Sequence, residues 1–167
     1  MSIEIERKYI IAMPNFDEIK TRDNYKSSEI LQIYLNSDKG VTHRVRKRNY
    51  GDRISYTETK KVRIDKMSAI EDEREITASE FDALSENIRE GSRPLTKVRY
   101  TFDFSGLCFE IDVYPEWKQT SIMELELESE DKHFEIPPFI RVIREVTGDK
   151  KYSNSSMSQA FPREELV

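Results

Sequence analysis

Charged and apolar side chains alternate along much of this chain, and the pattern begins within a few residues of its N-terminus. Glu4, Glu6 and Lys8 occupy every second position, while Ile5 and Tyr9 take positions of the other parity. Successive side chains of a β-strand point to opposite faces, so the two carboxylates and the ammonium share one face of such a strand. The pattern therefore predicts strands that have one charged face and one largely apolar face.

The same alternation recurs in later segments, and each of these carries charge of nearly one sign. The basic positions are Arg44, Arg46, Arg48, Lys97 and Arg99, and the acidic ones are Glu71, Glu73, Glu75, Glu110, Asp112, Glu124, Glu126 and Glu128. A sheet with one solvated face also alternates, so alternation alone leaves that interpretation open. Like-charged neighbours repel each other, however, and a merely solvated strand would normally mix the two signs. The segregation favours basic and acidic strands that face each other across an interior.

Eight segments read as strands, and turn residues separate three pairs of them as in β-hairpins. The segments are 3–11, 29–35, 41–49, 53–62, 69–76, 95–104, 107–114 and 120–129. The turns lie at 38–40, 49–52 and 105–106. Consecutive strands joined in this way predict a mainly β (α+β) fold, an eight-stranded antiparallel sheet closed into a barrel. We expect a single domain over residues 1–167, with a few helices packed outside.

Helix signals are fewer. Thr77 and Glu80 form a Thr-x-x-Glu start, and Phe81, Leu84 and Ile88 follow at helical spacing. Weaker patterns predict a helix within 15–25 and short helices at 140–146 and 155–160.

Composition excludes several classes of protein. The 167 residues include 27 basic and 32 acidic side chains, for a net charge of −5, so a general nucleic-acid binder is not expected. Cys108 is the one cysteine, which excludes an intrachain disulfide and a cysteine metal cluster, and two histidines leave little room for zinc. No apolar run resembles a signal peptide or a membrane span, so we expect a cytoplasmic protein.

A closed sheet with this pattern would place cations and carboxylates on opposite walls of a water-filled interior. Arginine can make bidentate contacts with phosphate oxygens. The carboxylates would repel a bare polyphosphate unless a divalent cation lay between them, and Mg²⁺ and Mn²⁺ prefer oxygen ligands shared with substrate phosphates. The predicted ligand is therefore a small-molecule triphosphate that is bound with Mg²⁺ or Mn²⁺.

An ordered series of motifs resembles the CYTH superfamily, whose members are also called triphosphate tunnel metalloenzymes. The resemblance starts with Glu-x-Glu-x-Lys at residues 4–8 and covers nearly the whole chain. Its further motifs lie at 32–35, 44–46, Lys60, 73–75, 97–100, 109–113, 124–126 and 145–154.

The resemblance implies an eight-stranded antiparallel tunnel that binds a triphosphate with one or two divalent cations. By similarity, the phosphate ligands would be Lys8, Arg44, Arg46, Lys60, Lys97, Arg99 and Lys151. The metal ligands would be Glu4, Glu6, Glu126, Glu124 and Asp149. Glu124, Glu73, Glu75 and Asp112 would support a second metal or an activated water. The candidate catalytic residues are therefore Lys8, Glu73, Glu75 and Asp112.

Hydrolysis of inorganic triphosphate is the activity that the short bacterial members of this superfamily suggest. A class IV adenylyl cyclase acting on ATP is the second interpretation, and a thiamine triphosphatase is the third. A polyphosphate- or nucleotide-binding module without catalysis is the non-enzymatic alternative. The sequence leaves open whether the chain forms a homodimer.

Overall fold

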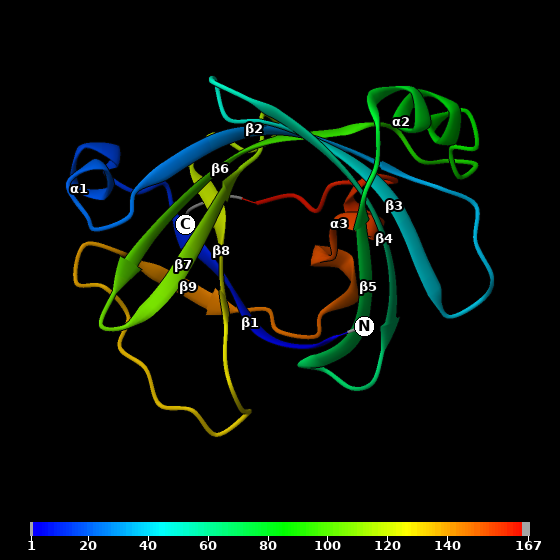
Figure 1. Cartoon of the computed structure of the whole chain (residues 1–167). Helices are drawn as coiled ribbons and strands as arrows, with labels where there is room; N and C mark the ends of the chain where they lie inside the picture. Colours follow the sequence, from blue (N-terminus) through cyan, green and yellow to red (C-terminus); the bar gives the residue numbers. More distant parts are fainter. Residues whose placement is uncertain (1, 165–167) are drawn as a thin grey trace.

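Nine antiparallel strands dominate the computed structural model, which describes residues 2–164 (Figure 1). They are β1 (Ser2–Ala12), β2 (Lys26–Tyr34), β3 (Val41–Asn49), β4 (Ile54–Arg63), β5 (Ser68–Glu75), β6 (Leu95–Phe104), β7 (Leu107–Val113), β8 (Thr120–Glu126) and β9 (Val142–Glu145). Neighbouring strands follow the order β5-β4-β3-β2-β6-β7-β8-β1, and β1 pairs in turn with β5. The predicted eight-stranded closed barrel is therefore confirmed.

The closing seam is short, and it explains the ninth strand. β1 pairs with β5 only over Ser2–Ile5, and farther along the same edge of β1 pairs with β9 at Tyr9, Ile10 and Ile11. The predicted helix at 140–146 is wrong, because this segment contains β9. Its apolar residues have helical spacing, but so short a helix gains little by itself, whereas the open edge of β1 offers unpaired backbone groups.

The predicted hairpin turns are confirmed. The tightest of them joins β6 to β7, where Ser105 and Gly106 have φ values of 48° and 79°. Two consecutive residues with positive φ match the right-handed twist of the flanking strands.

The helices are short and lie outside the sheet or at one end of it. They are α1 (Phe16–Lys20), α2 (Ala78–Ser85), the 3₁₀ helix η1 (Lys150–Tyr152) and α3 (Asn154–Met157). Thr77 and Glu80 form the predicted capping box of α2, with both hydrogen bonds at 3.1 Å. Within residues 2–164, no helix has the length and apolar character needed to span a bilayer.

Two hydrophobic clusters lie on the outer face of the barrel. In an ordinary small barrel this face would be the polar one, exposed to solvent. Ile19 of α1 belongs to the first cluster together with Phe102, Phe109 and Leu125. α2 covers the second, where Phe81 packs against Tyr56 with ring centroids 5.3 Å apart, on the outside of β2, β3 and β4. Packing outside the barrel therefore leaves its inner face for polar groups.

A third cluster corrects the expectation that charges line the whole interior. Ile10, Leu95 and Ile122 have the inward parity of their strands, and Tyr114 directly follows β7. All four pack against Tyr152 and other residues of the C-terminal segment. The interior is therefore charged over part of its length and apolar at one end.

Candidate functional site

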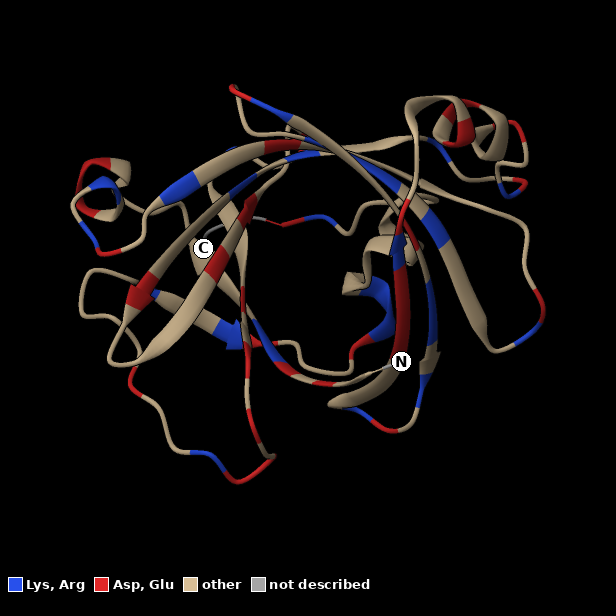
Figure 2. Ribbon diagram, in the orientation of Figure 1, with Lys and Arg blue, Asp and Glu red and all other residues tan. Residues whose placement is uncertain are grey.

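A cavity of about 540 Å³ occupies the charged part of the barrel interior. Charged residues of both signs line it. Segments rich in Lys and Arg and segments rich in Asp and Glu lie on strands around the barrel (Figure 2). The cationic lining residues are Lys8, Arg44, Arg46, Lys61, Arg63, Lys66, Arg99 and Lys150. The acidic ones are Glu4, Glu6, Asp65, Glu71, Glu73, Glu110, Glu124, Glu126 and Asp149.

Two arginines of β3 form the centre of the basic wall. Gln32 of β2 holds Arg46 through its Oε1 atom, which accepts from Nε at 2.9 Å and from Nη2 at 2.5 Å. Burial, with the nearby charges of Arg44 and Arg99, lowers the pKa of Arg46 to about 9. Arg46 is therefore still protonated at neutral pH. The Nε atom of Arg44 is buried and has no hydrogen-bond partner among the residues that the structure describes. Crowded cations with spare donors are a binding site for an anion.

The acidic wall comes mainly from β1 and β8, where Glu6 lies opposite Glu126 and Lys8 opposite Glu124 in the strand register. Burial and the charge of Glu124 raise the pKa of Glu6 to about 8. Burial, together with the charges of Glu4 and Glu110, also raises the pKa of Glu126. Both carboxyls therefore bind a proton more tightly than a free glutamate does, and a bound cation could take the place of that proton.

Glu4 and Glu71 share the negative charge near the closing seam. Burial raises the pKa of Glu4, but hydrogen bonding to Glu71 and the charge of Lys61 outweigh it and lower that pKa to about 2. Burial and the hydrogen bond to Glu4 raise the pKa of Glu71 to about 7. Lys61 Nζ donates to Glu4 Oε1 at 3.0 Å. One proton and one lysine thus offset two carboxylates that face each other.

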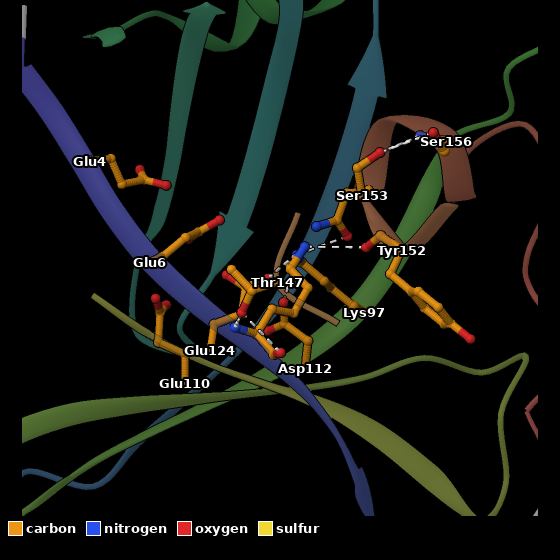
Figure 3. Close-up of polar contacts among 12 residues, drawn as sticks. Glu4, Glu6, Lys97, Glu110, Asp112, Glu124, Thr147, Tyr152, Ser153 and Ser156 are labelled. Carbon is orange, nitrogen blue, oxygen red and sulfur yellow. Dashed lines mark hydrogen bonds and ion pairs between the residues drawn. The ribbon is translucent and has the colours of Figure 1, made fainter. Parts of the chain in front are cut away.

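The donor set fits a hard divalent cation in its chemistry, because such ions take carboxylate oxygens. Within residues 2–164, however, no group of three or more His, Cys, Asp and Glu side chains is gathered closely enough to hold a metal ion. Glu4, Glu6, Glu110 and Glu124 project from neighbouring strands without converging (Figure 3). A cation held here would therefore need ligands besides the protein carboxylates, as Mg²⁺ does when it shares substrate phosphates.

A buried ion-pair network supports the cavity from behind. Asp112 receives two hydrogen bonds from Arg99 at 2.8 and 2.9 Å, and Lys97 Nζ lies 2.8 Å from its Oδ2 atom. Burial disfavours the charged carboxylate, but Arg99 and Lys97 outweigh it and hold the pKa of Asp112 far below its usual range. Burial also lowers the pKa of Lys97. Arg99 reaches the cavity, and neither Asp112 nor Lys97 is among its lining residues.

Comparisons with known proteins identify relatives of this chain. No protein-family model matches the chain. An inorganic triphosphatase from Acetivibrio thermocellus is 32% identical over 159 residues, which is 94% of each protein. The chain belongs to the triphosphate tunnel metalloenzyme superfamily. The crystal structure of an inorganic triphosphatase superposes on this tunnel enzyme with a TM-score of 0.61 at 28% identity, covering 98% of this chain and 99% of the other.

Two more distant structures share the fold of the tunnel. A Hippeastrum protein, described as a candidate adenylyl cyclase with a dominant triphosphatase activity, gives a TM-score of 0.50 at 15% identity and covers 75% of this chain and 80% of its own. A candidate adenylate cyclase from Vibrio parahaemolyticus gives 0.53 at 10% identity and covers 75% of this chain and 78% of its own.

One predicted tunnel residue faces the wrong way. Lys60 is exposed on the outside of β4, across from His43 and Asp72, and Lys61 lines the tunnel instead. Neighbouring side chains of a strand take opposite faces, so the shift by one residue inverts the assignment. The sequence did contain a signal that favours Lys61: Arg63, a second basic residue, has the same parity, and it also lines the cavity.

The other predicted residues divide between the cavity and its surroundings. Glu73 lines the cavity and accepts from Thr59 Oγ1 at 3.3 Å, whereas Glu75 is exposed and does not line it. Asp149 lines it and caps η1, but Lys151 lies over the ring of Tyr152, with Nζ 5.5 Å from the centroid.

Of the described residues that line the cavity, sixteen were not among the candidate site residues, and half of these lie in the C-terminal segment. They are Tyr34, Thr42, Lys61, Arg63, Asp65, Lys66, Glu71, Glu110, Val146, Thr147, Gly148, Lys150, Ser153, Asn154, Ser155 and Ser156. Glu71 and Glu110 had been placed on the charged strand faces, and the C-terminal residues other than Ser155 and Ser156 lie within the motif at 145–154. Gly148 shows why this segment fits so closely. Its φ is 75°, and an added Cβ would lie 2.8 Å from the Cβ of Lys66. Serines and glycine in a non-strand segment carry no periodic signal that would have assigned them to the cavity.

Proposed function

We propose that this tunnel enzyme hydrolyses inorganic triphosphate with the help of Mg²⁺ or Mn²⁺. The observation that carries the proposal is the cavity that Arg44 and Arg46 line together with the carboxylates of Glu6 and Glu126. The 32% identity to an inorganic triphosphatase over nearly the full chain supports the same activity.

The basic residues bind and orient the phosphate chain. Arg44 has an unpaired Nε donor, and Arg46 is held in place by Gln32, so both can meet phosphate oxygens with little rearrangement. Lys8, Lys61 and Arg99 contribute further positive charge from other walls. Neutralising the charge that spreads over the transferred phosphoryl group is the main catalytic contribution expected in such reactions.

The acidic residues have two roles. Glu4, Glu6, Glu124 and Glu126 would hold the divalent cation, which when bound offsets phosphate charge. Glu73 lies on the cavity wall beside the Glu71–Glu4 pair and would orient the attacking water. Asp112 then supports Arg99 rather than touching substrate, because both of its oxygens already accept from cations.

The lining of the cavity favours an inorganic substrate over a nucleotide. Within residues 2–164, Tyr34 is the only aromatic side chain that lines it, and the Tyr34 hydroxyl accepts from Gln32 Nε2 at 3.1 Å. A nucleobase is usually held by stacking on an aromatic face or by apolar contacts, and charged groups dominate this lining. The adenylyl cyclase reaction remains the second candidate, and thiamine triphosphate hydrolysis the third.

One panel tests the proposal. The purified protein is assayed on inorganic triphosphate, ATP and thiamine triphosphate with Mg²⁺ or Mn²⁺, and phosphate, pyrophosphate and cyclic AMP are measured. We expect phosphate release that is fastest from inorganic triphosphate and that stops with EDTA. Pyrophosphate with cyclic AMP from ATP would favour the cyclase, and full activity in EDTA would reject the metal. Binding of triphosphate without turnover would favour a binding module.

A further inference from the structure

A helix of four residues supplies part of the cavity wall. In α3, Asn154 and Ser155 line the cavity, and Asn154 Oδ1 accepts from Lys97 Nζ at 3.3 Å. Just before the helix, the carbonyl oxygen of Tyr152 accepts from Lys8 Nζ at 3.2 Å (Figure 3). Helices this short are not stable alone in water. The placement of these acceptors must therefore come from tertiary contacts.

Arg89, in the loop between α2 and β6, makes the densest set of such contacts. Its Nη1 donates to Ser155 Oγ at 2.8 Å, and its Nη2 donates to the Ser155 carbonyl at 2.7 Å and to Ser158 Oγ at 3.3 Å. Its Nε donates to Ser92 Oγ at 2.9 Å. The backbone amide of Arg89 donates to the carbonyl of Tyr34, at the end of β2, at 2.8 Å. One residue thus ties the barrel to α3.

The guanidinium group lies behind the cavity wall. Arg89 is not a lining residue, but Ser155 and Tyr34, which it contacts, both are. Its Cζ lies 5.8 Å from the centroid of the Tyr34 ring. Among residues 2–164, no carboxylate forms an ion pair with Arg89. The planar fork of donors, rather than pairing of charge, therefore explains why arginine occupies this position.

We propose that Arg89 is a positioning residue that holds residues 153–156 against the cavity and thereby keeps the substrate site in its binding shape. It acts through Ser155 and α3, without touching substrate. The kinetic part of this proposal rests on the proposed triphosphatase activity, and the structural part does not.

Substitution of Arg89 tests the kinetic part. Arg89→Met keeps much of the apolar stem and removes every donor, so the KM for inorganic triphosphate should rise about tenfold, the scale of one lost charge-assisted hydrogen bond. The kcat should change less, because the groups that contact the phosphates remain. Arg89→Lys keeps the charge but loses the planar fork of donors, and its KM should lie between those of the wild type and Arg89→Met.

The single tryptophan provides a readout that needs no activity. The ring of Trp117 packs 6.4 Å from that of Tyr152 and 5.7 Å from that of Phe161, measured between centroids, and its Nε1 donates to the carbonyl of Pro162 at 2.8 Å. A loosened C-terminal segment should expose this indole. We expect quenching of its fluorescence by acrylamide to increase roughly twofold in Arg89→Met.

Arg93→Met is the matched control, because Arg93 lies in the same loop with an exposed side chain. It should leave KM and quenching unchanged. Unchanged KM and quenching in Arg89→Met would overturn the proposal, and so would an equal KM increase in Arg93→Met, which would indicate a general effect of charge. If Arg89→Met does not fold, Arg89→Lys decides by the same two measurements. If the wild type does not hydrolyse triphosphate, the proposed function fails, and quenching still tests whether Arg89 holds residues 153–156 in place.

Discussion

The charged cavity and the apolar end of the barrel lie side by side along the same strands, and they differ by a step of two residues. On β1 the inward positions Glu6 and Lys8 are followed by Ile10, and on β8 Glu124 is preceded by Ile122. Ile10 and Ile122 are 0% and 1% exposed. Burial of such side chains stabilises the fold by about 1.5–3 kcal/mol each. The apolar end thus helps to offset the electrostatic repulsion within the cavity. One region stabilises the fold, and the other provides the binding site.

The largest expected loss of catalytic efficiency follows from Arg44→Ala. Removing this cation should lower kcat/KM for inorganic triphosphate by about 10³-fold or more, because transition-state charge is no longer neutralised. The melting temperature should hardly change. Arg48→Ala is the control, since Arg48 shares the strand face but bonds to Ser28 and does not line the cavity. Retention of activity within tenfold in Arg44→Ala would contradict the assignment of the basic wall.

The border between the two regions is tested at Asp112. Asp112→Ala should lower the free energy of unfolding by about 3–5 kcal/mol, because Lys97 would remain buried without a carboxylate partner and Arg99 would keep only its ion pair with Glu110. Asp112→Asn should cost less, since the amide oxygen can still accept. Urea unfolding measures both variants. A normal unfolding curve combined with a lost kcat would instead make Asp112 a catalytic residue, as the family resemblance implied.

The apolar end should respond in stability alone. Ile122→Ala leaves a cavity in a fully packed cluster, and we expect it to lower the free energy of unfolding by about 2–5 kcal/mol. The kcat per folded molecule should be unchanged. Ile3→Ala is the control, because Ile3 is 65% exposed and should change stability by less than about 0.5 kcal/mol. A substantial change in kcat for Ile122→Ala would show that the two regions are not separate.

Adjacent lysines of β4 sharpen the comparison between the inside and the outside of the barrel. Lys61→Ala should lower kcat/KM about 10- to 100-fold, because Lys61 faces the cavity and bonds to Glu4. Lys60→Ala should have no effect, because Lys60 faces outward. Steady-state kinetics on inorganic triphosphate decides, and the opposite ranking would indicate that the register of β4 is wrong.

A pH dependence of stability in the presence of EDTA is the remaining expected effect. The pKa of Glu6 is raised from 4.5 to about 8 in the folded protein. Between these values the folded state binds a proton that the unfolded state does not, so stability from Glu6 is complete below about pH 4.5 and is lost as pH rises through about 8. Glu6→Gln should flatten this part of the curve, and Glu75→Gln, at an exposed position, should not. Urea unfolding at several pH values measures the slope, and identical curves for wild type and Glu6→Gln would reject it.

Much of the site could be predicted because a β-strand translates sequence parity directly into faces. Arg44, Arg46, Glu4, Glu6, Glu124 and Glu126 all line the cavity as expected. Parity fails where two candidates are adjacent, as with Lys60 and Lys61, because only the register with neighbouring strands chooses between them. Parity also does not tell how deeply a side chain is buried within the barrel. Lys97 and Asp112 were therefore not distinguished from groups that reach the cavity.

By itself, the sequence determined the barrel, its hairpins and the two oppositely charged walls, because alternation and turn chemistry are local properties of the chain. The tertiary structure alone decided where the interior ends and what completes its wall. The short seam between β1 and β5 leaves an edge for β9, which Arg7 contacts through Glu145. The segment after β9 lines the cavity and is held by Arg89 through Ser155. These contacts join residues 66–138 positions apart, so no local pattern encodes them.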